Sequence, residues 1–226
     1  MSSLDAIKAG GECIRYLRAS GFEVEQVGDA ELIKDLIADT KKEWFTRTMS
    51  GDFNDFTSAN HFWLVARKAD NVCGVLGARL DTIPDKISAF WASQQKRLYG
   101  NGHQVLDPSH VPPIAETMKG KAAYFGDLFL ASEERVPLEQ FVLLGYSIAY
   151  AKWAPNWYYA FVKERRMSAQ IRKLRMPHVY PGAQRWLRPV AQRDDRDWLI
   201  CMSDADFIYS LGDFLWRSEK ARVAQS

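Results

Sequence analysis

The stretch YFGDLFLASEERVPLEQFVLLGY, residues Tyr124 to Tyr146, decides the fold. Its first seven residues form an apolar and aromatic run that predicts a strand from Tyr124 to Leu130. A short polar turn follows, and Pro137 then opens a segment whose apolar residues have helical spacing. A strand that leads through a tight turn into a helix is an arrangement that often holds phosphate groups. This turn, Ala131 to Arg135, contains no glycine.

The segments on either side of this stretch predict an α+β fold. Phe22 to Val27 alternates apolar and polar residues, which predicts a strand. Residues 61–83 contain two runs of β-branched and aromatic residues on either side of the polar turn KADN, which predicts a hairpin. Trp157 to Val162 predicts a buried strand, parallel to Tyr124–Leu130 and joined to it by a right-handed crossover. Helices and hairpins in this order predict a largely antiparallel sheet with one strand-helix-strand unit at its centre.

The length of 226 residues, with 47% hydrophobic and 26% charged residues, predicts one globular domain, residues 1–226. Helical spacing predicts an N-terminal helix over 5–18 and a C-terminal helix over 205–223. Residues 81–121 interrupt the pattern as an insertion, which is either a lid or substrate wall or a packed surface excursion. AQRWLRPVA and RDWLICMS predict a second hairpin around QRDD.

Composition narrows the classes of function. A net charge of +2 argues against a nucleic-acid-binding module. The sequence shows neither an apolar run long enough for a membrane span nor a signal peptide, so we expect a cytoplasmic protein. Cys13, Cys73 and Cys201 are widely separated and have no histidine ladder, so we expect reduced thiols and no metal site. The sequence does not indicate the oligomeric state.

The segment GDLFLASEER, Gly126 to Arg135, resembles the central motif of the GNAT acyltransferase superfamily, E-D-L-x-V-x-P-E-x-R-G-x-G-x-G/A. The matching positions are Asp127, Leu128, Phe129, Glu133 and Arg135. The order of elements is similar from about residue 22 to residue 203, and IRKLRM stands where the family has Y-E-K-L-G-F. The resemblance implies a GNAT-like, mostly antiparallel sheet whose central parallel strands splay around a cleft, flanked by helices.

Two features depart from the family pattern. The glycines that let backbone N–H groups approach a pyrophosphate are replaced by residues 136–140, where Pro137 lacks an N–H and Glu139 adds a negative charge. The glutamate that deprotonates the accepting amine in many relatives is Gly126 here, and the tyrosine that protonates the leaving thiolate falls at Ile171. The donor implied by the resemblance is therefore acetyl-CoA, another acyl-CoA, or an acyl-carrier-protein thioester.

Three residues are candidates for catalysis. Asp127 lies on the central strand, where it is either a general base or a carboxylate bonded to the neighbouring backbone or to an arginine. Tyr124 and Tyr180 either replace the missing acid or are ordinary half-buried tyrosines.

The resemblance also implies the donor contacts. The backbone of the central strand, with the N–H groups of Leu130 and Ala131, is expected to polarise the thioester carbonyl. Arg165 and Arg166 belong to a basic cluster that either grips a CoA phosphate or an acidic carrier protein, or is a solvated face. The predicted cofactor-binding residues are Leu128, Phe129, Leu130, Ala131, Arg135, Val136, Leu138, Arg165 and Arg166.

The leading hypothesis is an acyltransferase in which a small-molecule or peptide amine attacks an acyl thioester directly. A catalytically silent GNAT-like protein that binds a ligand or a partner is the alternative, because it accounts for the missing glycines, glutamate and tyrosine.

Overall fold

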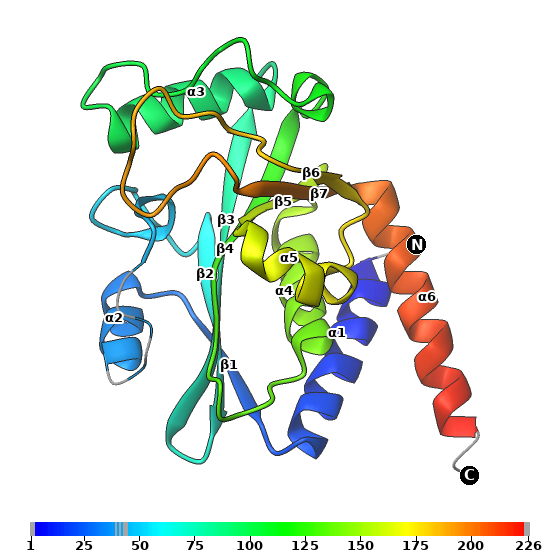
Figure 1. Ribbon diagram of the computed structural model, residues 1–226. Coiled ribbons are helices and arrows are strands. Elements are labelled where there is room, and N and C mark those ends of the chain that lie inside the picture. The colour runs from blue at the N-terminus through cyan, green and yellow to red at the C-terminus, as the bar shows by residue number, and fades with distance from the viewer. Residues whose placement is uncertain (1–2, 39, 41, 43–44, 224–226) are drawn as a thin grey trace.

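The computed structural model describes residues 3–38, 40, 42 and 45–223. Seven strands form one sheet in the order β1-β2-β3-β4-β5-β7-β6 (Figure 1). The strands are β1 Glu23–Val27, β2 His61–Lys68, β3 Asn71–Ile83, β4 Gly120–Leu130, β5 Trp157–Val162, β6 His178–Tyr180 and β7 Trp198–Ser203. Within the described chain, β4 and β5 are parallel and every other neighbouring pair is antiparallel. The predicted α+β class and its central parallel pair are confirmed.

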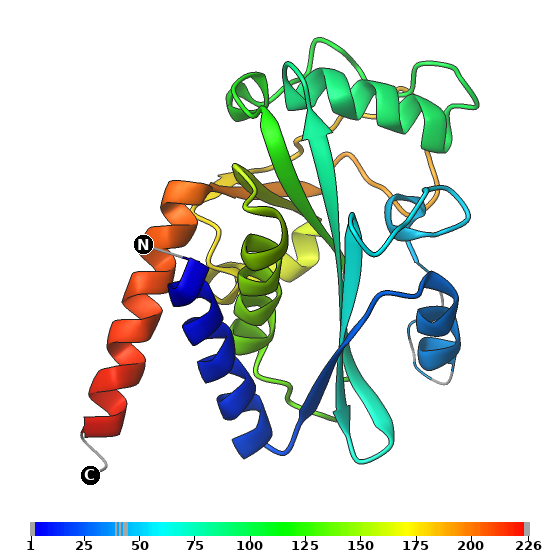
Figure 2. The same cartoon turned by 180° about the vertical axis from the view of Figure 1, so that it is seen from behind.

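Helices cover both faces of this sheet. They are α1 Ser3–Ala19, α2 Ala30–Ala38, α3 Ile87–Tyr99, α4 Leu138–Trp153, α5 Glu164–Leu174 and α6 Asp204–Val223, with short 3₁₀ turns at Arg47–Met49 and Pro113–Glu116. The two views show α1, α4 and α6 together on one side of the sheet and α2 on the other (Figures 1 and 2). The helices predicted at 5–18 and 205–223 correspond to α1 and α6.

Each face of the sheet has its own apolar core. Residues from α1, α4, α5 and α6 pack on one face, and residues from α2, α3 and the 45–60 loop pack on the other. The first six residues of β2, His61–Ala66, are therefore all buried, because a strand covered on both faces has no solvent side. The hydrophobic effect on the two faces together fixes the position of the central strands.

The insertion and the second hairpin differ from prediction at specific residues. β3 continues to Ile83 and β4 begins at Gly120, so the inserted segment is 84–119, and its Trp91 packs against the rings of Tyr159 and Phe161. The predicted second hairpin is wrong, because residues 181–197 form an irregular connection and β7 pairs with β6 instead. Pro189 interrupts the run that we predicted as its first strand, since proline cannot donate a ladder hydrogen bond. None of the described helices is long and apolar enough to cross a membrane.

Candidate active site

A cavity opens where the two parallel strands separate. β4 and β5 pair only from Ala122–Trp157 to Phe125–Ala160, after which β4 stays with β3 and β5 stays with β7. The cavity has a volume of about 490 Å³. On the α4 side its lining includes Leu76, Phe125, Val142, Tyr146, Leu174 and Ile200, and on the other side Lys42, Thr46, Tyr124, Asp127, Gln192 and Arg193. This central cavity therefore crosses the sheet, apolar on one face and polar on the other.

A β-bulge in β4 shapes the edge of this cavity. The register with β3 shifts between Val75–Phe129 and Gly77–Gly126, which places one extra residue in β4 opposite Leu76. Asp127 lies in this bulge with a φ of 55°, in the left-handed region that aspartate tolerates better than most residues. The bulge turns the last residues of β4 away from β5.

One N–H group near the end of β4 is turned away from β3, toward the side on which β4 and β5 separate. Ala131 donates its N–H to the carbonyl of Cys73 on β3 at 2.8 Å, so this expected donor is already used inside the sheet. The carbonyl of Leu128 accepts a hydrogen bond from Arg166 of α5 at 3.4 Å, on the other side of the strand. Because backbone groups alternate along a strand, the N–H of Leu130 faces the same side as Leu128. Leu130 is therefore the candidate oxyanion donor of this strand.

Asp127 is held by the segment before the first 3₁₀ turn. Its carboxylate accepts hydrogen bonds from the Thr46 N–H at 3.0 Å and the Thr46 hydroxyl at 3.0 Å, and Lys42 Nζ lies 3.1 Å away. The Asp127 side chain is only 2% exposed. These contacts favour the structural interpretation of Asp127 over the general base, with a lysine in place of the arginine we considered.

Tyr124 fills the space that a side chain at position 126 would need. A Cβ on Gly126 would lie 2.7 Å from Tyr124 Cε1 and 2.9 Å from the Tyr124 hydroxyl oxygen, closer than such atoms approach. Burial raises the pKa of the Tyr124 phenol, so the group is neutral at physiological pH. Its oxygen accepts a hydrogen bond from Arg193 Nη2 at 3.2 Å, which leaves the phenolic hydrogen free to be donated.

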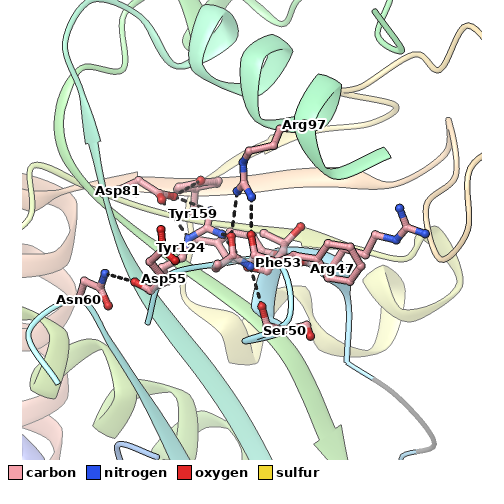
Figure 3. Close-up of polar contacts among 12 residues, drawn as sticks. Arg47, Ser50, Phe53, Asp55, Asn60, Asp81, Arg97, Tyr124 and Tyr159 are labelled. Atoms are coloured by element: carbon pink, nitrogen blue, oxygen red, sulfur yellow. Dashed lines mark hydrogen bonds and ion pairs between the residues drawn. The ribbon is translucent and has the colours of Figure 1, made fainter. Parts of the chain in front are cut away.

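Buried charges support the wall behind Tyr124. Arg79 forms an ion pair with Asp81 at 2.9 Å, and the Tyr159 hydroxyl donates to the same carboxylate at 2.8 Å. Arg79 also donates to the carbonyl of Thr48 at 2.6 Å, which fixes the 45–60 loop against the sheet. Figure 3 shows Tyr124, Tyr159 and Asp81 side by side, with Arg97 of α3 reaching the backbone carbonyl of Phe53 in that loop. The loop that carries Thr46 and Thr48 is thus hydrogen-bonded to β3 through Arg79 and to α3 through Arg97.

The mouth of the cavity is basic. Lys163, Arg165 and Arg166 line it at the start of α5. The carboxylates of the lining are all in ion pairs within the described chain: Asp127 with Lys42, Asp194 with Arg196 and Asp197 with Lys163. The unneutralised charge at the mouth is therefore positive.

The beginning of α4 is occupied by the protein itself. The side chains of Val136 and Leu138 are buried in the core, and Arg135 is exposed outside the cavity lining. Arg175 Nε lies 2.7 Å from the Glu139 carboxylate in the first turn of α4. A phosphate at this helix end would have to displace that pair.

Several predicted residues lie apart from the cavity, and several residues of the cavity were not predicted. Tyr180 is half-buried in β6 opposite Leu199, and neither it nor any residue of 84–119 belongs to the lining. Leu128, Phe129, Arg165 and Arg166 do line the cavity, as do Lys42, Thr46, Gln192 and Arg193, which no motif singles out. Among described residues no three His, Cys, Asp or Glu side chains cluster as metal ligands.

Comparison with known proteins adds a likeness in fold. No protein-family model matches the sequence, and no curated protein matches it. Three solved structures are similar over 80% of this chain: the apo form of an agmatine N-acetyltransferase variant (12% identity, 99% of that chain, TM-score 0.49), Arabidopsis thaliana NAA60 in complex with acetyl-CoA (13%, 98%, 0.45) and a Drosophila melanogaster polyamine N-acetyltransferase (10%, 99%, 0.45).

The fold is GNAT-like. Its GNAT-like features are the mostly antiparallel sheet, the bulge in β4 and the parallel pair β4–β5, which separates beyond Phe125 and Ala160. The mostly antiparallel sheet and the splayed central parallel pair are the features that the resemblance of Gly126–Arg135 to the GNAT motif predicted.

Proposed function

We propose that the protein is an N-acyltransferase that moves an acyl group from a thioester donor to an amine. The observation that carries the proposal is the central cavity, which opens between two parallel strands beside the end of β4, where the Leu130 N–H is turned away from β3. A carbonyl placed against this N–H would be polarised, and the oxyanion of the tetrahedral intermediate would gain a hydrogen bond from it. Pockets of this volume accommodate small-molecule ligands and cofactors.

The donor is a phosphopantetheine thioester, on CoA or on a carrier protein. Its phosphates are held by Arg165 and Arg166 at the mouth, because Glu139 and Arg175 occupy the beginning of α4. The pantetheine arm passes into the cavity between β4 and β5. Both sources share this chemistry, so a direct comparison of acyl-CoA with acylated carrier protein identifies the donor.

The reaction follows from the groups in the cavity. The amine lone pair attacks the thioester carbon, the C–N bond forms and the C–S bond breaks. Tyr124 donates its phenolic proton to the departing thiolate, and the phenolate, held by Arg193, takes one proton from the nitrogen. The products are an amide and a free thiol, and Tyr124 returns to its neutral form.

The test has a binding stage and a chemical stage. Calorimetry with CoA, acetyl-CoA, octanoyl-CoA and acylated carrier protein measures Kd, and a thiol-reactive dye then measures thiol release with amines. Replacing Arg165 and Arg166 by alanine is expected to weaken donor binding by about 10- to 100-fold, the range for one or two charge-assisted hydrogen bonds. Arg172→Ala, an exposed arginine of the same helix outside the cavity, is the matched control. Absence of binding by every donor would refute the proposal.

A silent binding protein is the second candidate, and one observation favours it. Every carboxylate of the described cavity lining is ion-paired, so none is an obvious base for the amine. Binding of a donor without thiol release across the amine panel would select this candidate.

A further inference from the structure

Arg193 is a cation of the cavity wall that donates hydrogen bonds to two hydroxyl groups of the described chain. It lies in the connection between β6 and β7, and its Nη2 donates to the Thr48 hydroxyl at 3.0 Å and to the Tyr124 hydroxyl at 3.2 Å. Its guanidinium lies 5.5 Å from the centroid of the Phe161 ring. In the described part of the chain, Arg193 is in no ion pair, and its Nε is buried without a hydrogen-bond partner.

Arg79, which also contacts Thr48 and Tyr124, differs from Arg193 in having an acidic partner. Arg79 is buried and forms an ion pair with Asp81 at 2.9 Å, whereas Arg193 is half-buried and is in no ion pair within the described chain. Buried charges in proteins are normally paired, because removing an ion from water without a partner is costly. No described residue accepts a hydrogen bond from Arg193 Nε, so this group lacks an acceptor. Because Arg193 lines the cavity, a ligand in the cavity is the natural source of that acceptor.

Gln192, the neighbouring residue, supplies a complementary group. Its Oε1 is buried and has no hydrogen-bond partner in the described chain, and the residue also lines the cavity. Its backbone has a φ of 69°, a conformation that a glutamine adopts only at a cost. Strained residues and unsatisfied buried polar atoms concentrate at binding sites. Two consecutive residues of the cavity lining thus carry an acceptor oxygen and an N–H donor that have no partner among the described residues.

We propose that Gln192 and Arg193 form the acceptor subsite and that the acceptor is an α-amino acid. Its carboxylate pairs with the Arg193 guanidinium, and its neutral amine donates an N–H to Gln192 Oε1 while the nitrogen lone pair attacks the thioester. The inference rests on the proposed acyl transfer and adds the class of acceptor to it. Phosphates of the donor are served by the exposed cations of α5, whereas Arg193 lies deep beside Tyr124.

The experiment compares three forms of one acceptor. Each of the twenty amino acids is tested for thiol release with the donor that binds best, and the best acceptor is compared with its carboxamide and its decarboxylated amine. The free amino acid is expected to have a kcat/KM about 10- to 100-fold above the other two, the range for a charge-assisted pair. Equal rates for the three forms would overturn the inference and leave the acyltransferase standing, whereas no thiol release with any amine would overturn both.

Variants of Arg193 and Gln192 distinguish a loss of carboxylate binding from a general loss of activity. Arg193→Gln is expected to lower the ratio of kcat/KM for the amino acid to kcat/KM for the carboxamide at least about tenfold, whereas Gln192→Leu, which removes the contact with the amine, is expected to lower both kcat/KM values and to leave their ratio unchanged. Arg188→Gln, an exposed position on the same connection outside the lining, is the control. Because Arg193 also supports Tyr124, the ratio of amino acid to carboxamide is the readout, and an unchanged ratio in Arg193→Gln would refute the subsite. If Arg193→Gln does not fold, Arg193→Lys takes its place: loss of the planar guanidinium is expected to lower the same ratio, and an unchanged ratio would refute the subsite.

Discussion

Replacing Asp127 by alanine should destabilise the protein strongly, because the carboxylate joins β4 to a segment more than 80 residues away. The side chains of Asp127 and Lys42 are 2% and 9% exposed, and Thr46 donates two groups to the same carboxylate. Removing one partner of a buried pair costs about 3–5 kcal/mol. In a chain of this size 1 kcal/mol shifts the melting temperature by about 2–4 °C, so we expect a decrease of roughly 6–20 °C.

Asp127→Asn is the matched variant. Asparagine keeps the shape, an acceptor oxygen for Thr46 and tolerance of the left-handed φ, so we expect a loss of only about 1–2 kcal/mol. Thermal and urea unfolding of both variants measure stability, and thiol release per folded molecule measures activity. A general base would lose about 100-fold or more in rate on conversion to asparagine. A stable Asp127→Ala variant, or a fully folded Asp127→Asn variant without activity, would refute the structural interpretation.

Two further predictions concern stability. Ala154 ends α4 with a φ of 44°, so Ala154→Gly should raise the free energy of unfolding by about 1 kcal/mol, and urea unfolding that shows a loss instead would contradict this. Burial lowers the pKa of His61 below its ordinary value of 6.5, so the unfolded chain binds this proton more readily and stability should fall as the pH decreases below about 6.5. In His61→Phe, unfolding measured from pH 8 to pH 5 should show a weaker pH dependence, and an unchanged profile would assign the effect to other groups.

The sequence predicted the centre of the fold because the relevant signals are local. The run from Tyr124 to Leu130, the turn and the helix that Pro137 precedes are contiguous, so their periodicity determines the elements. The residues around the cavity were harder to predict, because Lys42 and Thr46 meet Asp127 only after the sheet has formed. Gln192 and Arg193 lie in an irregular connection where we predicted a hairpin turn, and their unpaired atoms are visible only in three dimensions.

The ring of Tyr124 restricts which side chains position 126 can carry. A glutamate installed at position 126 would collide with the phenol, whose atoms already lie within 3 Å of where its Cβ would be. A glutamate at position 126 therefore requires a smaller residue at 124 first, and a chain with only that first change would lack both the phenol and the carboxylate. The chain can therefore carry the Tyr124 phenol or a glutamate at position 126, but not both. A stepwise change from one to the other passes through a variant that has neither group.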